Sequence, residues 1–435
     1  MSIRHALCAI LFSTLCGLSV AAEQPSFPTL HQSHYFLTVD NNGNSFFGTS
    51  VAIAGDTVVV GAENQGSDRQ GAAFVFTKSG NSWTQVAQLT ASDNMAGEEV
   101  GFSLAISSDG NTIFVGAPVL AVNGFPPGSV YVFVKPAGGW MKKMTETAKL
   151  TATNSGYLGT SLALSGDGTT LVVGSEGQSG YVFVKPQGGW VSTNTPSATL
   201  ADTTNPAVRY ASISPDGSTI ADGVVDSKTQ NGVALVYLRP GSQWHGAVNP
   251  TAKLAPSTLT SPPGFGDEFG AGIATDGNIV AIGAVQQNNL MGDAYIYVKP
   301  VGGWKNMTET ATISPPTAGL GQPSDFFGFP VLMAGKTVLV GYGGAIAIEN
   351  GRQWLSGEAY GYVEPNGGWQ NTDNPTFSLL PSQLINLNVD VFLFCNSMAV
   401  DASSNTVLVG APGSWYKGQP LQGFPGLSFL FDVKK

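Results

Sequence analysis

The chain has 435 residues, a formal net charge of −10 and only 19 Lys and Arg residues, which form no run anywhere in the sequence. Phosphate backbones and anionic membrane surfaces are bound through clustered cations, so this charge pattern argues against nucleic acid or an anionic membrane as the partner. With 42% hydrophobic and 11% charged residues the composition is globular, and 56 glycines indicate many turns.

The first 22 residues have the pattern of a secretory signal peptide. Arg4 is their only full charge, an apolar run extends from Ala6 to Leu18, and Val20-Ala21-Ala22 precedes Glu23. We expect cleavage after Ala22 and a location that is extracellular or periplasmic. The apolar run is too short to span a bilayer, and no later stretch approaches the ~20 apolar residues that a membrane helix needs. We therefore expect no membrane span.

Cysteine usage bears on how the exported chain is stabilised. Cys8 and Cys16 lie in the expected signal peptide, which leaves Cys395 as the only cysteine of the mature chain. An exported domain without disulfides depends on a large hydrophobic core. We expect residues 23–435 to form one domain and to be monomeric.

One sequence phrase recurs along the mature chain. It opens with Phe47-Gly48, passes through Gly61-Ala62 and closes at Trp83 and Leu89. Its landmark glycine falls at Gly48, Gly101, Gly159, Gly270 and Gly328, with Val208 and Cys395 at the equivalent place in two degenerate copies. Each copy contains four short runs rich in β-branched and aromatic residues, and no amphipathic helical stretch interrupts them. Seven such copies predict an all-β, seven-bladed β-propeller of four-stranded antiparallel blades.

Turn signals separate the predicted strands. Asp-Gly pairs such as Asp109-Gly110 join the first two strands and favour tight two-residue hairpins. Pro-Gly-Gly segments such as Lys135 to Trp140 mark the turn between the third and fourth strands. Because strand direction alternates, both kinds of hairpin lie on one face, and the longer loops between the second and third strands lie on the other.

The seventh copy ends at Phe429-Leu430-Phe431 and lacks a fourth strand. Other copies place a tryptophan ten residues before the closing leucine, as in Trp140 and Leu150, and Phe27 and Leu37 keep the same spacing. The N-terminal segment Phe27 to Asp40 is therefore expected to complete the last blade. Closing the ring in this way removes exposed sheet edges.

The Phe-Gly start followed by Val-Gly-Ala-Pro, as at Val115 to Pro118 and Val409 to Pro412, resembles the FG-GAP repeat of integrin α-chain propellers. The resemblance covers the mature chain and implies a seven-bladed propeller with a binding or cell-adhesion role. Some blades of that family carry an Asp-rich calcium loop in the first hairpin. Calcium needs six to eight oxygen ligands, whereas the matching hairpins here contain one Asp at most, so we expect no calcium and no other cofactor.

Variable loops on a rigid frame are where binding sites usually lie. Two tryptophans, Trp354 and Trp415, fall in such loops and outside the repeat's own tryptophan position. Aromatic residues and arginine dominate binding hot spots, so these two belong to a candidate ligand-binding surface. Its members are Trp354, Arg352, Trp415, Tyr416, Phe125 and Phe424. The alternative is that these side chains only pack the long loops. The six repeat-position tryptophans favour hairpin packing over a ring of sugar-stacking platforms.

Acidic residues precede several inner strands, at the mouth of the expected channel: Glu98, Glu99, Asp267, Glu268 and Asp325. They could supply a general acid and base for a secreted carbohydrate-active hydrolase or lyase, or form a solvated acidic rim. No Gly-x-Ser-x-Gly elbow, Cys–His pair, Cys-x-x-Cys motif or phosphate loop is present. The sequence therefore favours a non-enzymatic module that binds a protein or glycan ligand through its long-loop face.

Overall fold

The structure is a computed structural model of the chain. It describes residues 27–37, 45–93, 95–118, 127–153, 155–176, 180–201, 206–226, 232–258, 266–316, 326–349, 352–381, 389–390, 393–401, 403, 405–413, 415–416 and 426–433. The expected signal peptide, residues 1–22, lies outside these ranges. Within them, no helix is long and apolar enough to cross a membrane.

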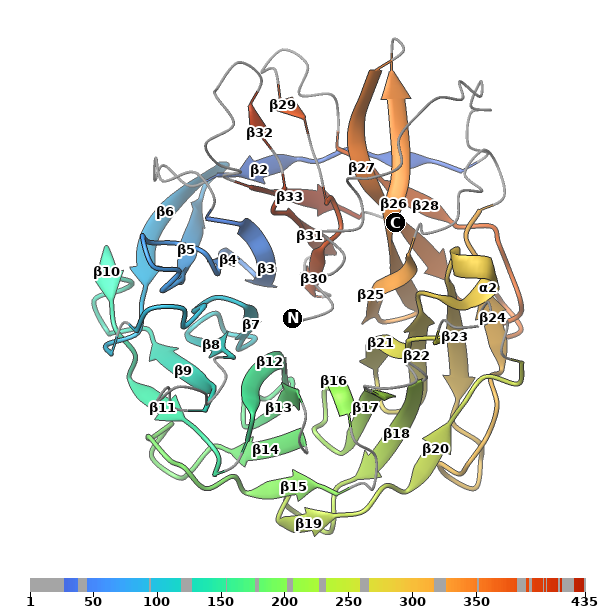
Figure 1. Cartoon of the computed structure of the whole chain (residues 1–435), viewed down its shortest axis with the longest axis horizontal. Helices are drawn as coiled ribbons and strands as arrows, with labels where there is room; N and C mark the ends of the chain where they lie inside the picture. The colour runs from blue at the N-terminus through green and yellow to red at the C-terminus, as the bar shows by residue number, and fades with distance from the viewer. Residues whose placement is uncertain are drawn as a thin grey trace.

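Seven antiparallel sheets stand around a common axis in chain order, which confirms the seven-bladed propeller (Figure 1). Blade 1 contains β3 (Phe47–Ala54), β4 (Thr57–Ala62), β5 (Ala72–Ser79) and β6 (Ser82–Leu89); blade 2 contains β7 (Ser103–Ile106), β8 (Thr112–Ala117), β9 (Ser129–Val134) and β11 (Ala148–Leu150). Blade 3 contains β12 (Tyr157–Leu164), β13 (Thr170–Glu176), β14 (Gly180–Val184) and β15 (Ala198–Leu200); blade 4 contains β16 (Pro206–Ile213), β17 (Thr219–Asp226), β18 (Gly232–Leu238) and β20 (Ala252–Leu254).

Blade 5 contains β21 (Phe269–Thr275), β22 (Ile279–Ala284), β23 (Asp293–Val298) and β24 (Ala311–Ile313); blade 6 contains β25 (Phe327–Ala334), β26 (Thr337–Glu349), β27 (Arg352–Val363) and β28 (Phe377–Leu379). Blade 7 contains β30 (Ser397–Asp401), β31 (Thr406–Ala411), β33 (Leu427–Asp432) and β2 (His34–Phe36). A short two-stranded ribbon joins β29 (Val389–Asp390) to β32 (Trp415–Tyr416). In the described part of the chain, helix is confined to the four residues of α2 (Gln287–Leu290).

The hydrophobic core lies between the faces of neighbouring blades. The second strand of a blade is covered on both sides, so β4 is buried throughout its length and reads as the continuous run Thr57–Ala62. One core cluster joins Val58 and Val60 of blade 1 to Leu408 and Leu430 of blade 7, across the seam of the ring. Burial of apolar area between blades is therefore the main stabilising term, as expected for an all-β fold without disulfides.

The two glycines of the repeat serve this blade packing. Gly101 lies two residues before the inner strand of blade 2 and has a φ of +97°, a conformation that glycine adopts without strain. Its carbonyl oxygen points at Gly61 in β4, where a Cβ atom would overlap that oxygen. The repeat therefore requires glycine at both positions for close packing of blades. Cys395, which replaces the landmark glycine in blade 7, keeps the left-handed conformation with a φ of +71° and is buried.

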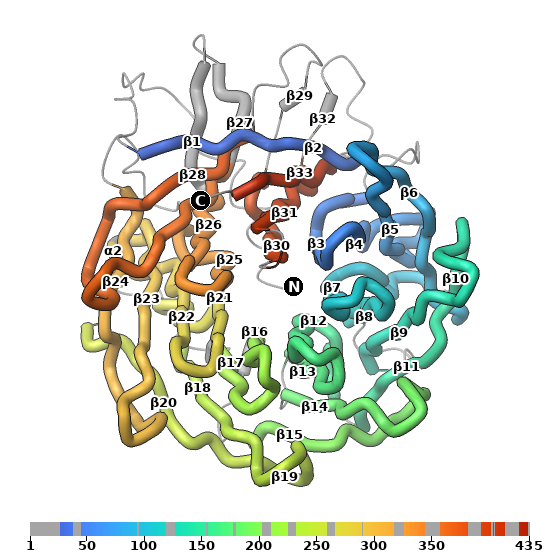
Figure 2. Tube along the Cα trace, turned by 180° about the vertical axis from the view of Figure 1, so that it is seen from behind, coloured from blue at the N-terminus to red at the C-terminus, as the bar shows by residue number. Residues whose placement is uncertain are grey.

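The N-terminal strand closes the ring as expected. β2 pairs antiparallel with β33, so that His34, Tyr35 and Phe36 lie opposite Leu430, Phe429 and Ser428. The preceding segment β1 (Thr29–Leu30) pairs in parallel with β28 of blade 6. Figure 2 shows this blue segment running along the outside of blades 6 and 7. The N-terminus thus ties the last two blades together.

The prediction of two-residue Asp-Gly turns was wrong for three blades. The amide of Ser107 donates to the carbonyl of Thr112, which leaves a loop of residues 108–111, and the loops at 166–169 and 215–218 are built in the same way. Asp109 explains the wider loop, because its Oδ1 accepts hydrogen bonds from the Ser107 hydroxyl and the Asn111 amide. A carboxylate that bonds its own backbone two residues on stabilises this turn without a narrower hairpin.

The connections between third and fourth strands differ from plain hairpins in most blades. After the Pro-Gly-Gly turn of blade 2, β10 (Lys143–Met144) reaches back and pairs in parallel with Gln88 and Leu89 of β6 in blade 1. Similarly, β19 (Gly246–Val248) pairs with β15. Single parallel bridges occupy this place at three other junctions, Leu150 with Thr193, Leu254 with Met307 and Ile313 with Thr372. We call these segments, together with β1, the outer belt.

Candidate functional site

The strands that carry four of the six predicted ligand-binding residues are neighbours. Arg352 is the first residue of β27, opposite Glu349 at the end of the long hairpin formed by β26 and β27. Trp354 lies two residues further along the same strand. Trp415 and Tyr416 form β32, which pairs with β29, and β29 contacts β27. Figure 1 shows both elements at the edge of blades 6 and 7. Phe125 and Phe424 lie outside the described residues.

The predicted acidic residues form two separate pairs. Glu98 and Glu99 precede the inner strand of blade 2, whereas Asp267 and Glu268 precede the inner strand of blade 5. These blades do not adjoin in the ring of seven, so the two pairs belong to separate parts of the ring. Asp325 lies outside the described residues.

Backbone strain next to these acids follows the repeat. Glu99 and Glu268 have φ values of +57° and +47°, which non-glycine residues seldom adopt. The equivalent residues of three further blades, Phe46, Phe326 and Leu393, share this conformation. This backbone conformation therefore recurs with the repeat, at the point where the chain enters a blade. It does not mark a catalytic position.

In blade 5, the acidic pair is held by the backbone and by one amide side chain. Oδ1 of Asp267 accepts hydrogen bonds from the amides of Gly232 (2.6 Å) and Phe269 (3.1 Å). Nε2 of Gln286 donates to Oε1 of Glu268 at 2.6 Å. Burial raises the pKa of both carboxyls, and that of Glu268 rises to about 7, helped by the charge of Asp267.

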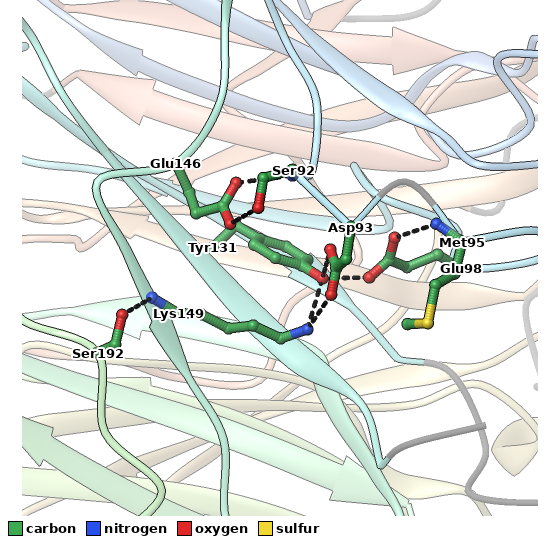
Figure 3. Close-up of polar contacts among 8 residues, drawn as sticks. All are labelled: Ser92, Asp93, Met95, Glu98, Tyr131, Glu146, Lys149 and Ser192. Atoms are coloured by element: carbon green, nitrogen blue, oxygen red, sulfur yellow. Dashed lines mark hydrogen bonds and ion pairs between the residues drawn. The ribbon is translucent and has the colours of Figure 1, made fainter. Parts of the chain in front are cut away.

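In blade 2, the buried side chains of Glu98 and Tyr131 form a polar network with Lys149 and the exposed Asp93 (Figure 3). The Tyr131 hydroxyl contacts Oε1 of Glu98 and lies 2.8 Å from Oδ1 of Asp93. Nζ of Lys149 lies 2.9 Å from that hydroxyl and 2.5 Å from Oδ2 of Asp93. The amide of Met95 donates to the second oxygen of Glu98. Four side chains from the outer half of blade 2 and the preceding connection thus meet at one phenol oxygen.

The hydrogen-bond donors and the pKa shifts distinguish the two carboxyl groups of this network. The Tyr131 hydroxyl carries one hydrogen, yet it contacts two carboxyl groups, while Lys149 can only donate to it. Burial raises the pKa of Glu98, and the hydrogen bond from Tyr131 offsets this only in part. For Asp93 burial acts in the same direction, but the hydrogen bonds from Lys149 and Tyr131 outweigh it and lower the pKa. Of the two carboxyls, Glu98 is therefore the one that takes a proton more readily, and Asp93 is the ion partner of Lys149.

A protonated carboxyl beside an ionised one is the usual equipment of an acid–base catalyst. Here, however, Glu98 is 1% exposed and Tyr131 is fully buried, so a substrate has no access to either side chain. Glu98 was predicted from the sequence, whereas Tyr131, Asp93 and Lys149 were not. The sequence did offer one signal for Asp93 and Lys149: Asp93 follows the closing leucine of blade 1, and Lys149 directly precedes the closing leucine of blade 2. The network is built to join blade 2 to the connection that enters it.

Four repeat-position tryptophans are buried, as the packing interpretation predicted: Trp190, Trp244, Trp304 and Trp369. The indole N–H groups of Trp244 and Trp304 donate to the carbonyls of Gly217 and Gly277, at the first hairpin of their own blades. These two rings therefore both pack against the blade and hold its first hairpin by a hydrogen bond. Buried rings in this position offer no face to a sugar.

Among the described residues, no group of three or more His, Cys, Asp or Glu side chains is arranged to hold a metal ion. The first-hairpin aspartates are engaged within their turns. Asp167 accepts hydrogen bonds from Ser165 and Thr169, and Asp216 accepts them from Ser214 and Ser218. These carboxylates act as turn caps.

The fold and these turns define a seven-bladed β-propeller whose repeat glycines pack one blade on the next. Residues 34–76 and 83–133 match the family model of the FG-GAP repeat. No curated protein matches the chain. Two stretches that match the FG-GAP repeat thus lie on a seven-bladed propeller frame, in the N-terminal strand and blades 1 and 2.

Proposed function

We propose that this propeller is a non-enzymatic binding module of the adhesion type, which recognises a protein or glycan ligand through the elements at the edge of blades 6 and 7. One observation carries the proposal. The hairpin of β26 and β27, the longest pair of strands in the described chain, lies beside the ribbon of β29 and β32, and these elements carry Arg352, Trp354, Trp415 and Tyr416. Aromatic residues and arginine gathered on extended elements of a rigid frame suit a binding surface.

The alternative function, a carbohydrate-active hydrolase or lyase, receives less support. The acids proposed for it are divided between blades 2 and 5, and Glu98, Asp267 and Glu268 are buried. Glu99 forms an ion pair with Arg69. Each of the four acids has a local partner that accounts for its position, so no free acid–base pair faces a substrate.

The binding proposal is tested by glycan-array and pull-down screening of the mature protein, followed by titration of any ligand found. Trp354→Ala and Trp415→Ala are expected to weaken binding at least tenfold, because each removes a large aromatic contact. Val301→Ala, at a fully exposed position on a Pro-Gly-Gly turn, serves as the control and should leave binding unchanged. Unaltered binding by both tryptophan variants would remove this surface. Turnover of a glycan that is lost in a variant with Glu98, Glu99, Asp267 and Glu268 all replaced would instead favour the enzyme.

We further propose that the frame needs no calcium. Each first-hairpin carboxylate described above is engaged by hydroxyl and amide donors of its own turn, which supports this view. Calcium or a chelator is expected to leave the thermal midpoint unchanged in a melting experiment. A midpoint that rises with calcium concentration would contradict it.

Export is likewise proposed, on the signal-peptide pattern of residues 1–22. Mass spectrometry of the protein recovered from its own host is expected to give a mature N-terminus at Glu23. Recovery of the full-length chain in the cytoplasmic fraction would contradict export.

A further inference from the structure

The outer belt is interrupted at one of the seven junctions between blades. In six blades, an outer strand ends in a leucine or isoleucine, and the next residue donates its amide to a belt carbonyl. These pairs are Thr90 to Met144, Thr151 to Thr193, Ala201 to Val248, Ala255 to Met307, Ser314 to Thr372 and Leu380 to Leu30. In the seventh blade, β2 ends its sheet, and no other strand of the described chain pairs with its outer edge.

The sequence explains the gap. The belt residue comes from the segment that precedes the fourth strand of the following blade. This segment requires a spacing of nine or ten positions from the turn tryptophan, or from Phe27 in its place, to the closing residue. Blade 1 has only six, from Trp83 to Leu89. Its chain turns back at once, with Ser79 opposite Ser82, and β6 pairs with β5 over its whole length. Blade 1 therefore has no segment that could reach β2.

A groove occupies the place where the missing belt segment would lie. Its volume is about 640 Å³, and it is lined by β2 and the following Leu37, by Phe76 of β5, by Trp83 to Ala87 of β6 and by Lys142. Aromatic rings form its floor: Phe36 lies 5.4 Å from Trp83 and 5.0 Å from Phe76, measured between ring centroids. The groove thus combines an open strand edge with an apolar base.

We propose that this groove binds an extended peptide segment of a partner protein, which pairs in parallel with β2 and completes the outer belt. The belt residues at the six intact junctions indicate which side chains the bound segment should carry. The residue opposite each closing leucine or isoleucine is Met144, Thr193, Val248, Met307, Thr372 or Leu30, and none of these is charged. The occupant is therefore a short extended segment with an uncharged, mostly aliphatic residue opposite Leu37.

This mode of recognition is strand addition at a sheet edge, in which main-chain hydrogen bonds supply affinity and alternate side chains supply specificity. An exposed edge also invites uncontrolled pairing unless it is short or covered. β2 is only three residues long, which limits such pairing and suits a specific, reversible partner. The site is separate from the one proposed at β27 and β32, so either can fail without the other.

The test uses a fluorescent peptide with the sequence of residues 142–147, Lys-Lys-Met-Thr-Glu-Thr, which includes β10 of the intact belt. Titration with the mature protein is expected to give saturable anisotropy with micromolar affinity. Replacing the peptide's methionine by aspartate, or reversing the peptide sequence, should weaken binding at least tenfold. In hydrogen exchange, the bound peptide should slow exchange of residues 33–37.

Protein variants locate the site. Thr84→Arg places a bulky charge at an exposed position in the groove and should weaken binding at least tenfold, whereas Thr251→Arg, exposed on blade 4, should not. No saturable binding, or equal binding by the Thr84 variant, would overturn the proposal. So would protection, in the free protein, of the β2 amides that face away from β33, because it would assign the groove to this chain. A dimer that Thr84→Arg dissociates would assign it to a second copy and would equally overturn the proposal.

Discussion

The Oγ of Ser50 donates a hydrogen bond to the carbonyl oxygen of Gly101 at 2.6 Å and so joins blade 1 to blade 2. The same contact recurs from Ser103 to Gly159 and, across the seam of the ring, from Ser397 to Gly48. In each case the donor lies two residues after the landmark position of its own blade, and the acceptor is the landmark glycine of the next. The repeat thus encodes a polar link between blades in addition to close packing.

Removing this link should destabilise the fold by a predictable amount. Ser50→Ala leaves a buried carbonyl without its donor, which is expected to lower the free energy of unfolding by about 1–3 kcal/mol. Urea unfolding followed by tryptophan fluorescence measures the change. Ser79→Ala, at an exposed position of β5, is the control and should change stability by less than about 0.5 kcal/mol. Equal urea midpoints for the Ser50 variant and the unmodified protein would mean that the link contributes nothing.

The network around Tyr131 makes a sharper prediction, because the pKa values of its two carboxyl groups are shifted in opposite directions. Glu98→Gln keeps a donor toward the Tyr131 hydroxyl and an acceptor for the Met95 amide, so it should alter stability by less than about 0.5 kcal/mol at neutral pH. Asp93→Asn removes the anion paired with Lys149 and should cost about 1 kcal/mol.

Thermal unfolding of these two variants in parallel gives the measurement, since both replace a carboxylic acid by its amide. A reversed ranking, in which Glu98→Gln is the more damaging change, would show that the proton resides on Asp93.

Glu268 predicts how stability depends on pH. Burial raises its pKa from 4.5 to about 7, so folding favours the protonated form. The stabilisation is complete below pH 4.5 and is lost as the pH rises through 7. A shift of this size corresponds to about 3 kcal/mol between the two limits. Glu268→Gln cannot ionise, so its stability relative to the unmodified protein should increase by about that amount from pH 4 to pH 8.

Asp167 supplies a control of opposite sign. Burial acts to raise its pKa, but hydrogen bonds from Ser165 and Thr169 outweigh it and lower the pKa. Asp167→Asn should therefore lose stability relative to the unmodified protein as the pH rises through the acidic range. Chemical unfolding at a series of pH values measures both variants. A Glu268→Gln difference that stays constant between pH 4 and pH 8 would contradict the raised pKa.

The features predicted from sequence are those that every blade repeats. Gly48, Gly61 and their counterparts recur at fixed places because each blade meets its neighbour through the same backbone contact. The spacing from Phe27 to Leu37 revealed the closing strand for the same reason: the seventh blade needs the fourth strand that all others have. A contact that every blade must make repeats the same residues at the same spacing, so a single sequence is enough to reveal it.

Features that depend on one particular pairing left no such pattern. The parallel contact of Met144 with Leu89 joins segments with little apolar alternation, and a Pro-Gly-Gly turn reads as an ordinary hairpin. The meeting of Tyr131 with Asp93 and Lys149 depends on where the ends of three side chains lie, which strand periodicity does not specify. The wider Asp109 turn was missed because the Asp-Gly pair alone does not reveal how many residues the Asp side chain will cap.

The seam of the ring offers the most direct test of how the fold is completed. Deleting residues 23–40 removes β1 and β2, exposes the outer edge of β33 and uncovers the core between blades 7 and 1. The truncated protein is expected to aggregate or remain unfolded, because an open propeller presents both a hydrophobic face and an unpaired strand.

A milder change separates loss of packing from loss of the strand. Phe36 is 2% exposed and packs against Phe76 and Trp83, so Phe36→Ala should lower the free energy of unfolding by about 3–5 kcal/mol while the ring still closes. Val191→Ala, at an exposed position on the Pro-Gly-Gly turn of blade 3, is the matched control. Size-exclusion chromatography and thermal melting are applied to the truncated protein, to Phe36→Ala and to the control. A truncated protein that stays monomeric with the intact protein's thermal midpoint would show that the N-terminal strand does not close the ring.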